Sequence, residues 1–203
     1  MSRGMLLVLA VLALAFAAIT GLAVRKGILG PETPAARIGG PFHLVDQTGG
    51  EVNEAILDDK WSAVFFGFTY CPEACPTTLF ALAQTERLLG PKAARFQTVF
   101  ISVDPGRDNP KTMAAYLSNG AFPTAVYGLT GTPAQVAQAA RAYGVFYQKA
   151  GEGPDYQVNH STITYLMSPG GRFVCALPYG TPPDVLARKI TTAMQQGPRA
   201  KSC

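Results

Sequence analysis

The stretch WSAVFFGFTYCPEACPTTLFALAQTERLLG, residues 61–90, combines three patterns that together decide the fold. Residues 61–68 form a continuous apolar run with aromatic and β-branched members, which is typical of a central strand covered on both faces. Residues 76–90 place apolar side chains at helical spacing and end in a glycine, so they predict a helix with a C-cap. Between them lie two cysteines. We therefore expect a buried strand that leads into a helix, with both thiols at the junction.

The chain on either side of this stretch continues the alternation of strands and helices. Gly49 and Gly50 predict the turn of a hairpin ahead of it, and residues 96–103 predict a second buried strand. The later segments predict, in order, a helix at 109–120, a strand at 124–131, a helix at 132–145, a hairpin within 161–177 and a helix at 182–194. This order predicts an α/β sandwich with a mixed central sheet.

Composition limits the class of protein. The 203 residues are 48% hydrophobic, which suffices for one domain with a well-buried core. The formal net charge of +4 comes mainly from the two tails, because residues 40 to 197 contain 11 basic and 12 acidic side chains. A nearly neutral domain argues against nucleic acid as a partner.

The N-terminal segment predicts passage across a membrane. Residues 5–24 carry no charge, and 20 helical residues span about 30 Å of hydrocarbon. A cleaved signal peptide is the alternative, but its apolar core needs only about 7 to 15 residues, so the length favours an uncleaved anchor. Arg25 and Lys26 outweigh Arg3 on the positive-inside count, which leaves the orientation open. An uncleaved anchor and a cleaved signal peptide would both still place the domain on the far side of the membrane.

Four parts of the chain follow from these patterns. Glycine, proline and alanine dominate the segment after the apolar run, without an apolar period, and predict a flexible tether. We expect an anchor or signal segment at residues 1–24, a tether at 25–40, one domain at 41–196 and a polar, mobile tail at 197–203.

The two cysteines of the junction each precede a proline. A residue before proline is pushed out of the α region, so Cys71 and Cys75 should both be extended, with Cys75 as the N-cap and Pro76 as the first helical residue. The positive end of a helix favours the thiolate, the form that attacks a disulfide or binds a metal. Two thiolates on one metal stand roughly 4 Å apart, a spacing that this turn allows. A stabilising disulfide, or two buried thiols, is the alternative.

Copper is the metal that this pair favours, because thiolates suit Cu(I) and copper sites commonly add an imidazole. The chain has two histidines. His43 falls in the first hairpin strand and is left out of the site. His160 falls at the entrance of a strand predicted to begin near Thr162, and becomes the candidate third ligand.

Three motifs, in order, resemble the SCO/SenC family of copper proteins: YCPEACPTTL (70–79), ISVDPGRDNP (101–110) and DYQVNHSTITYLMSPGGRFV (155–174). The resemblance covers about residues 41–194. It implies a thioredoxin-like domain on one membrane anchor, in the bacterial inner membrane facing the periplasm or the mitochondrial inner membrane facing the intermembrane space. It also implies a metallochaperone, not an enzyme, that binds copper as Cu(I) or Cu(II) and helps assemble the CuA centre of cytochrome c oxidase. The implied partners are the CuA-bearing subunit and other copper chaperones or thiol reductants.

Carried over by motif, the resemblance implies that Cys71, Cys75 and His160 bind copper and that the two cysteines can form a redox-active disulfide. It also implies a secondary role near the site for Asp104, although an aspartate that opens a turn explains this residue almost as well. One position departs from the family, which usually has aspartate where Asn159 stands. Loss of that charge would alter the surroundings of the histidine and hence metal affinity, not metal identity.

Other functions compete with copper delivery. A membrane-tethered thiol-disulfide oxidoreductase would keep the CuA-site cysteines reduced, and it also needs two activated thiols at a helix N-terminus. Against a thioredoxin-type enzyme, three residues separate the cysteines instead of two, and His160 and Ser161 stand where thioredoxins have a proline. A peroxiredoxin-like peroxidase fits less well, because Thr69 lies two residues before Cys71 and not three. A purely structural role leaves the cysteines and histidine unexplained.

Two further cysteines lie outside the motifs. Cys175 falls in a predicted strand and is expected to act as a small core residue, and Cys203 ends the tail. The sequence leaves a bond between them open.

Overall fold

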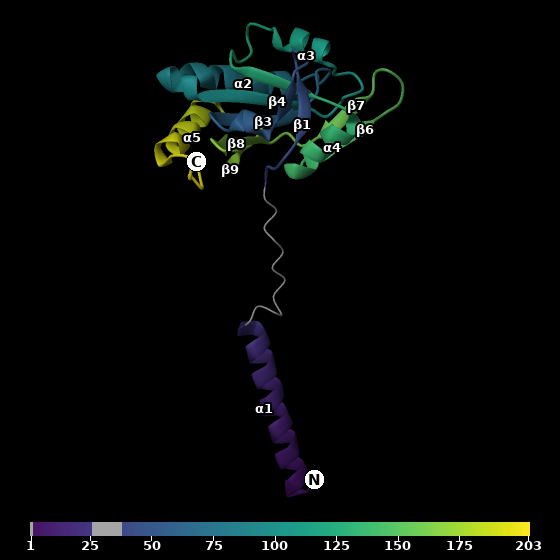
Figure 1. Ribbon diagram of the computed structural model, residues 1–203, viewed down its shortest axis with the longest axis vertical. Helices are drawn as coiled ribbons and strands as arrows, with labels where there is room; N and C mark the ends of the chain where they lie inside the picture. Colours follow the sequence, from purple (N-terminus) through teal and green to yellow (C-terminus); the bar gives the residue numbers. More distant parts are fainter. Residues whose placement is uncertain (1, 26–37) are drawn as a thin grey trace. The chain divides into compact units, whose positions relative to one another are not determined.

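A computed structural model describes residues 2–25 and 38–203, which form two separate units (Figure 1). The first unit contains α1 (Arg3–Arg25). Its segment Arg3–Leu22 has a mean hydropathy of 2.7 and is long and apolar enough to cross a membrane, by length and composition only. Most of the tether predicted at 25–40 lies outside the described residues.

The second unit is built on a mixed sheet of seven strands in the order β2-β1-β5-β4-β3-β8-β9. The central strands β3, β4 and β5 run parallel, and the flanking pairs are antiparallel. The strands are β1 (His43–Asp46), β2 (Glu51–Asn53), β3 (Trp61–Gly67), β4 (Phe96–Ser102), β5 (Val126–Thr130), β8 (Thr164–Ser168) and β9 (Arg172–Leu177). The predicted α/β sandwich with a mixed central sheet is confirmed.

Helices cover both faces of this sheet. The helices are α2 (Ala74–Leu89), α3 (Pro110–Leu117), α4 (Pro133–Ala142) and α5 (Pro183–Gln196), and η1 (Glu54–Leu57) and η2 (Gly90–Arg95) are short 3-10 turns. Successive residues of a strand face opposite sides. Phe65 accordingly packs in a cluster with residues of α2, α3 and α5, whereas its neighbours Val64 and Phe66 pack in a cluster with residues of α4. Every residue of β3 is buried, as its apolar run predicts.

The sequence did not predict a small second sheet. Strands β6 (Tyr147–Ala150) and β7 (Gln157–His160) pair antiparallel with each other, with Tyr147 opposite His160, and form a sheet apart from the main one (Figure 1). Each strand has four residues and lacks an apolar run, so no periodicity marks it. His160 therefore ends β7, and β8 begins at Thr164 and not near Thr162.

The C-terminal tail is attached to the domain, contrary to the expected mobile end. Cys175 of β9 forms a disulfide with Cys203, with the two Cα atoms 6.0 Å apart. Ala200 is buried, and both cysteines pack against the core cluster that contains α5. Cys175 is thus a crosslink as well as a packed residue, and residues 197–203 complete the domain.

We expect Cys203→Ser to lower the free energy of unfolding by about 2–4 kcal/mol, because the bond closes a loop with a sequence separation of 28 residues. Urea unfolding of the isolated domain, with and without reductant, measures this loss. Reductant should lower the free energy of unfolding of the parent to the value of the variant. Equal stability of the oxidised parent and the variant would show that the bond does not stabilise the domain.

Candidate metal centre

The two cysteines lie where β3 gives way to α2, but the helix begins earlier than predicted. Its first residue is Ala74 and its N-cap is Glu73, whose side chain makes no capping hydrogen bond. Cys75 is therefore the second helical residue, and the prediction that it is the N-cap is wrong. Its backbone N–H donates to Cys71 Sγ at 3.4 Å, so the sulfur of Cys71 takes up a donor that the N-terminus of a helix leaves free.

The sulfur of Cys75 is buried in the core. This packing outweighs the preference of a residue before proline for an extended backbone, so Cys75 is helical. The residue is 1% exposed and belongs to the same cluster as Phe65 and Phe100. Gly67, the last residue of β3, makes room for it. A Cβ at Gly67 would overlap Cys75 Sγ and would lie 2.8 Å from Phe100 Cε2, so this position requires a residue without a side chain.

His160 reaches the same place from β7. Its Nε2 lies 3.9 Å from Cys75 Sγ, and its ring stands edge-on to Phe68 at 5.7 Å between centroids. Its Nδ1 lies 2.9 Å from the carbonyl oxygen of Ser161. A carbonyl only accepts, so Nδ1 carries the proton and Nε2 presents a lone pair. The ligand atoms of Cys71, Cys75 and His160 all lie within 4.8 Å of one another.

Asn159, the departure from the family pattern, lies next to His160 in β7. It is exposed on β7, where it pairs with Gln148. It also lines a groove that runs past Cys71 and His160. The carbonyl of Ser161 is what orients the imidazole.

The two thiols differ in acidity. The pKa of Cys71 is lowered to about 4, mainly by the hydrogen bond from the Cys75 thiol, and further by the N–H groups of Cys75 and Glu73, whereas its partial burial opposes this. The pKa of Cys75 is raised, because its hydrogen bond to Cys71 and its burial both favour the neutral thiol. The site therefore has one half-exposed thiolate and one buried thiol that keeps its proton.

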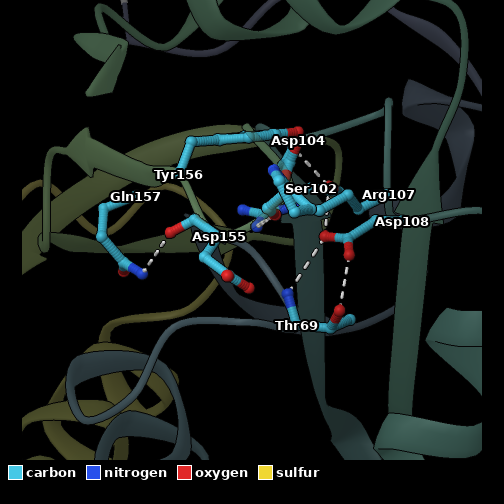
Figure 2. Close-up of polar contacts among 9 residues, drawn as sticks. Thr69, Ser102, Asp104, Arg107, Asp108, Asp155, Tyr156 and Gln157 are labelled. Carbon is cyan, nitrogen blue, oxygen red and sulfur yellow. Dashed lines mark hydrogen bonds and ion pairs between the residues drawn. The ribbon is translucent and has the colours of Figure 1, made fainter. Parts of the chain in front are cut away.

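Asp104, the predicted secondary residue, does not join the ligand group. Arg107 Nε donates to its Oδ2 and Tyr156 OH donates to its Oδ1, both at 2.5 Å (Figure 2). It also opens a turn, since the N–H groups of Arg107 and Asp108 donate to its carbonyl. Both carboxylate oxygens are thus occupied by side chains of the protein.

Asp108 was missed by sequence reasoning. It is fully buried and accepts from the N–H of Thr69 at 3.0 Å, from Thr69 Oγ1 at 2.5 Å and from Ser102 Oγ at 2.7 Å (Figure 2). Burial raises its pKa, which these hydrogen bonds oppose. These bonds fix Thr69, which lies two positions before Cys71. The one available signal is a second acid four residues after Asp104, and its contacts arise only in the fold.

These observations define a class of protein: an α/β sandwich with two thiols and an imidazole converging at the start of a helix, a ligand set for a soft metal such as Cu(I). The comparisons identify the family. A sequence model of the SCO1/SenC family matches residues 30–195, and the chain belongs to this family.

Individual relatives agree with that assignment. SenC of Rhodobacter capsulatus is 36% identical over 169 residues, which cover 83% of this chain and 74% of SenC. A solved structure of Bradyrhizobium japonicum ScoI with copper bound is 41% identical, with a TM-score of 0.68, and the match covers 74% of this chain and 96% of that one. SCO1 homolog 1 of Arabidopsis thaliana, a mitochondrial protein, is 42% identical over 155 residues, 75% of this chain but 45% of its own length. The chain spans about half the length of the mitochondrial relatives it matches. The predicted thioredoxin-like fold is confirmed.

We expect Cys71 of the reduced protein to react with iodoacetamide at a rate that stays constant from pH 8 down to about pH 5 and falls near pH 4. The thiolate is the reacting form, and it is lost only as the pH falls through the lowered pKa. Mass spectrometry of the labelled peptide measures the rate. Cys75→Ala removes the main hydrogen bond and should shift the profile upward, whereas a profile that rises only above pH 8 in the parent would contradict this assignment.

We expect Gly67→Ala to destabilise the domain by about 1–3 kcal/mol, because the added methyl group displaces Cys75 Sγ and Phe100. Urea unfolding measures the loss, and thiol titration of the folded variant reports the displaced sulfur. Gly120→Ala is the matched control, since a Cβ there meets nothing within 4 Å. Equal stability of the two variants would argue against the close approach at Gly67.

Proposed function

We propose that this chain is a membrane-anchored copper chaperone that binds one copper ion through Cys71, Cys75 and His160 and delivers it to, or prepares, the CuA centre of cytochrome c oxidase. The observation that carries the proposal is the convergence of two sulfurs and one free imidazole nitrogen within 4.8 Å. The copper bound to the ScoI structures of Bradyrhizobium japonicum and Arabidopsis thaliana supports the choice of metal.

The surroundings of the candidate ligands suit a metal ion that is transferred to another protein. A groove of about 380 Å³ runs past Cys71 and His160, between the cysteine loop and β7. Cys71 is half-exposed, whereas Cys75 is buried. An acceptor thiol can therefore reach a copper ion from the side of Cys71, and successive replacement of ligands would pass the ion on without releasing it to water.

A thiol-disulfide oxidoreductase is the second candidate, and the lowered pKa of Cys71 is the observation that favours it. The Cys71 thiolate would attack a disulfide of the CuA-bearing subunit and form a mixed disulfide. Cys75, after losing its proton, would attack the Cys71 sulfur. The products are a reduced acceptor and a Cys71–Cys75 disulfide, which an external thiol reductant must reduce again.

The N-terminal unit supports an exported, tethered domain. We propose that residues 1–24 anchor the chain in a bacterial inner membrane, or a mitochondrial inner membrane, and that residues 25–40 tether the domain from 41 onward in the periplasm or intermembrane space. The length and hydropathy of α1 support the anchor. The Cys175–Cys203 disulfide supports an oxidising compartment.

We expect His160→Ala to separate the two candidates. A metal site loses a direct ligand, so its copper affinity should fall by more than the about 10- to 100-fold that is typical when an outer-shell partner is lost. Competition titration with a Cu(I) chelator measures affinity, and oxidase activity in cells carrying the variant measures function. His43→Ala is the matched control, because that histidine is exposed on β1.

Copper delivery predicts that His160→Ala loses affinity and oxidase activity together while both thiols remain titratable. Cys71→Ser should abolish tight binding. If the parent binds copper and His160→Ala keeps full affinity, the third ligand is wrong. Full oxidase activity in His160→Ala, with loss of activity in Cys71→Ser, would favour thiol exchange as the function.

A further inference from the structure

The β6–β7 hairpin, residues 146–161, carries His160 but is not part of the main sheet. Among the described residues, few hydrogen bonds join this hairpin to the rest of the domain. Apart from the contact of His160 with Cys75, they are Arg107 Nη1 to the carbonyl of Pro154 at 3.2 Å and Tyr156 OH to Asp104 Oδ1 at 2.5 Å. Both end on the same short turn of the domain, at residues 104–108.

Arg107 is the centre of these contacts. Its guanidinium lies 3.7 Å from the ring centroid of Tyr156 in the hairpin and 4.6 Å from that of Tyr70, the residue before Cys71. Its Nε pairs with Asp104 Oδ2 (Figure 2). The side chains of Arg107 and Asp104 are only 14% and 5% exposed. Cation–π contacts and charge-assisted hydrogen bonds are stronger where water is excluded. One side chain thus connects the loop of the thiols to the hairpin of the imidazole.

The turn that holds Arg107 is fixed to the sheet. Asp108, at its end, accepts three hydrogen bonds from Thr69 and Ser102, which follow β3 and end β4. The position of the guanidinium is therefore set by the same strand ends that set the cysteine loop. The hairpin is the element that Arg107 holds against this base.

We propose that Arg107, paired with Asp104, is a positioning residue that holds His160 at its distance from Cys71 and Cys75, although it touches neither the thiols nor the imidazole. This proposal rests on the proposed function in one respect, that copper is bound there. Without the guanidinium, the hairpin keeps the packing of buried Val158 and the hydrogen bond of Tyr156 to Asp104, but loses the hydrogen bond at the Pro154 carbonyl and the cation–π contact at Tyr156. The imidazole then spends less time near the sulfurs, and two thiolates hold the copper alone.

This proposal also gives Asp104 a role without direct contact with copper. One of its oxygens accepts from the guanidinium of Arg107, in the same turn, and the other accepts from the phenol of Tyr156, in the hairpin.

Lysine cannot replace Arg107, because an ammonium lacks the planar group that stacks between two rings while its nitrogens donate in fixed directions.

Copper affinity is measured for Arg107→Met, Arg107→Lys, His160→Ala and the Arg107→Met/His160→Ala double variant. We expect Arg107→Met to weaken Cu(I) binding about 10- to 100-fold, with Arg107→Lys close to it. In the His160→Ala background the further effect of Arg107→Met should stay within about twofold, because the histidine through which Arg107 acts is gone. Arg188→Met, which removes an exposed ion pair with Asp184 on α5, is the matched control and should leave affinity unchanged. Equal effects of Arg107→Met in both backgrounds would overturn the proposal.

A second measurement does not need copper. Amide hydrogen exchange of the reduced apoprotein should become faster in residues 147–160 of Arg107→Met, while exchange in β3 and β4 stays as in the parent. Tyr156→Phe, which removes only the hydroxyl, should give a smaller change in the same residues. Unchanged exchange in the hairpin overturns the proposal even if copper binds. A parent without copper affinity would refute the proposed function, and exchange in the hairpin would still decide the role of Arg107.

Discussion

The buried carboxylate of Asp108 is the constraint on which the site depends. Its side chain accepts from Thr69 beyond β3 and from Ser102 at the end of β4, and its carbonyl accepts from Thr130 Oγ1 at the end of β5. The carboxyl ends of the three parallel strands are thereby joined at one residue. A buried carboxylate that lost these donors would cost several kcal/mol, so these hydrogen bonds hold the strand ends and the loops that follow them in place.

The asymmetry of the two thiols follows from this fixed base. The loop after Thr69 must pass directly into α2, which places Cys75 in the first turn of the helix and over Gly67, inside the core. Cys71 remains at the surface, where it accepts the N–H of Cys75. The hydrogen bond to Cys71, together with burial, keeps a proton on the sulfur of Cys75, and hydrogen bonds lower the pKa of Cys71. The same geometry thus suits both metal capture by two sulfurs and ordered attack on a disulfide.

The sequence predicted those elements and candidate ligands that a local pattern or a motif marks. The apolar runs of β3 and β4 marked their strands correctly, and the helices predicted at 109–120 and 132–145 correspond to α3 and α4, whose N-caps are Asn109 and Thr132. The three candidate ligands followed from spacing and resemblance, and the structure brings their atoms together, although binding by them stays a prediction. The β6–β7 sheet, the bond of Cys175 and the contacts of Arg107 and Asp108 depend on segments far apart in the chain, which no local period records. The start of α2 was misplaced because core packing of Cys75 outweighed the restriction before proline.

The ligands come from two bodies that are held with different strength, and this difference bears on how copper would be kept and released. Both cysteines belong to the junction fixed through Asp108, whereas His160 stands on a separate two-stranded hairpin, whose polar contacts with the junction include one guanidinium and one phenol and whose Tyr147, Tyr156 and Val158 pack against the core. A permanent metal site holds all its ligands on one rigid frame, so that none can leave alone. A carrier needs one ligand that can be displaced first, while the others retain the metal until an acceptor takes their place. In the proposed site that ligand would be the imidazole, and the contacts of the hairpin, not the chemistry of the sulfurs, would set how readily it leaves.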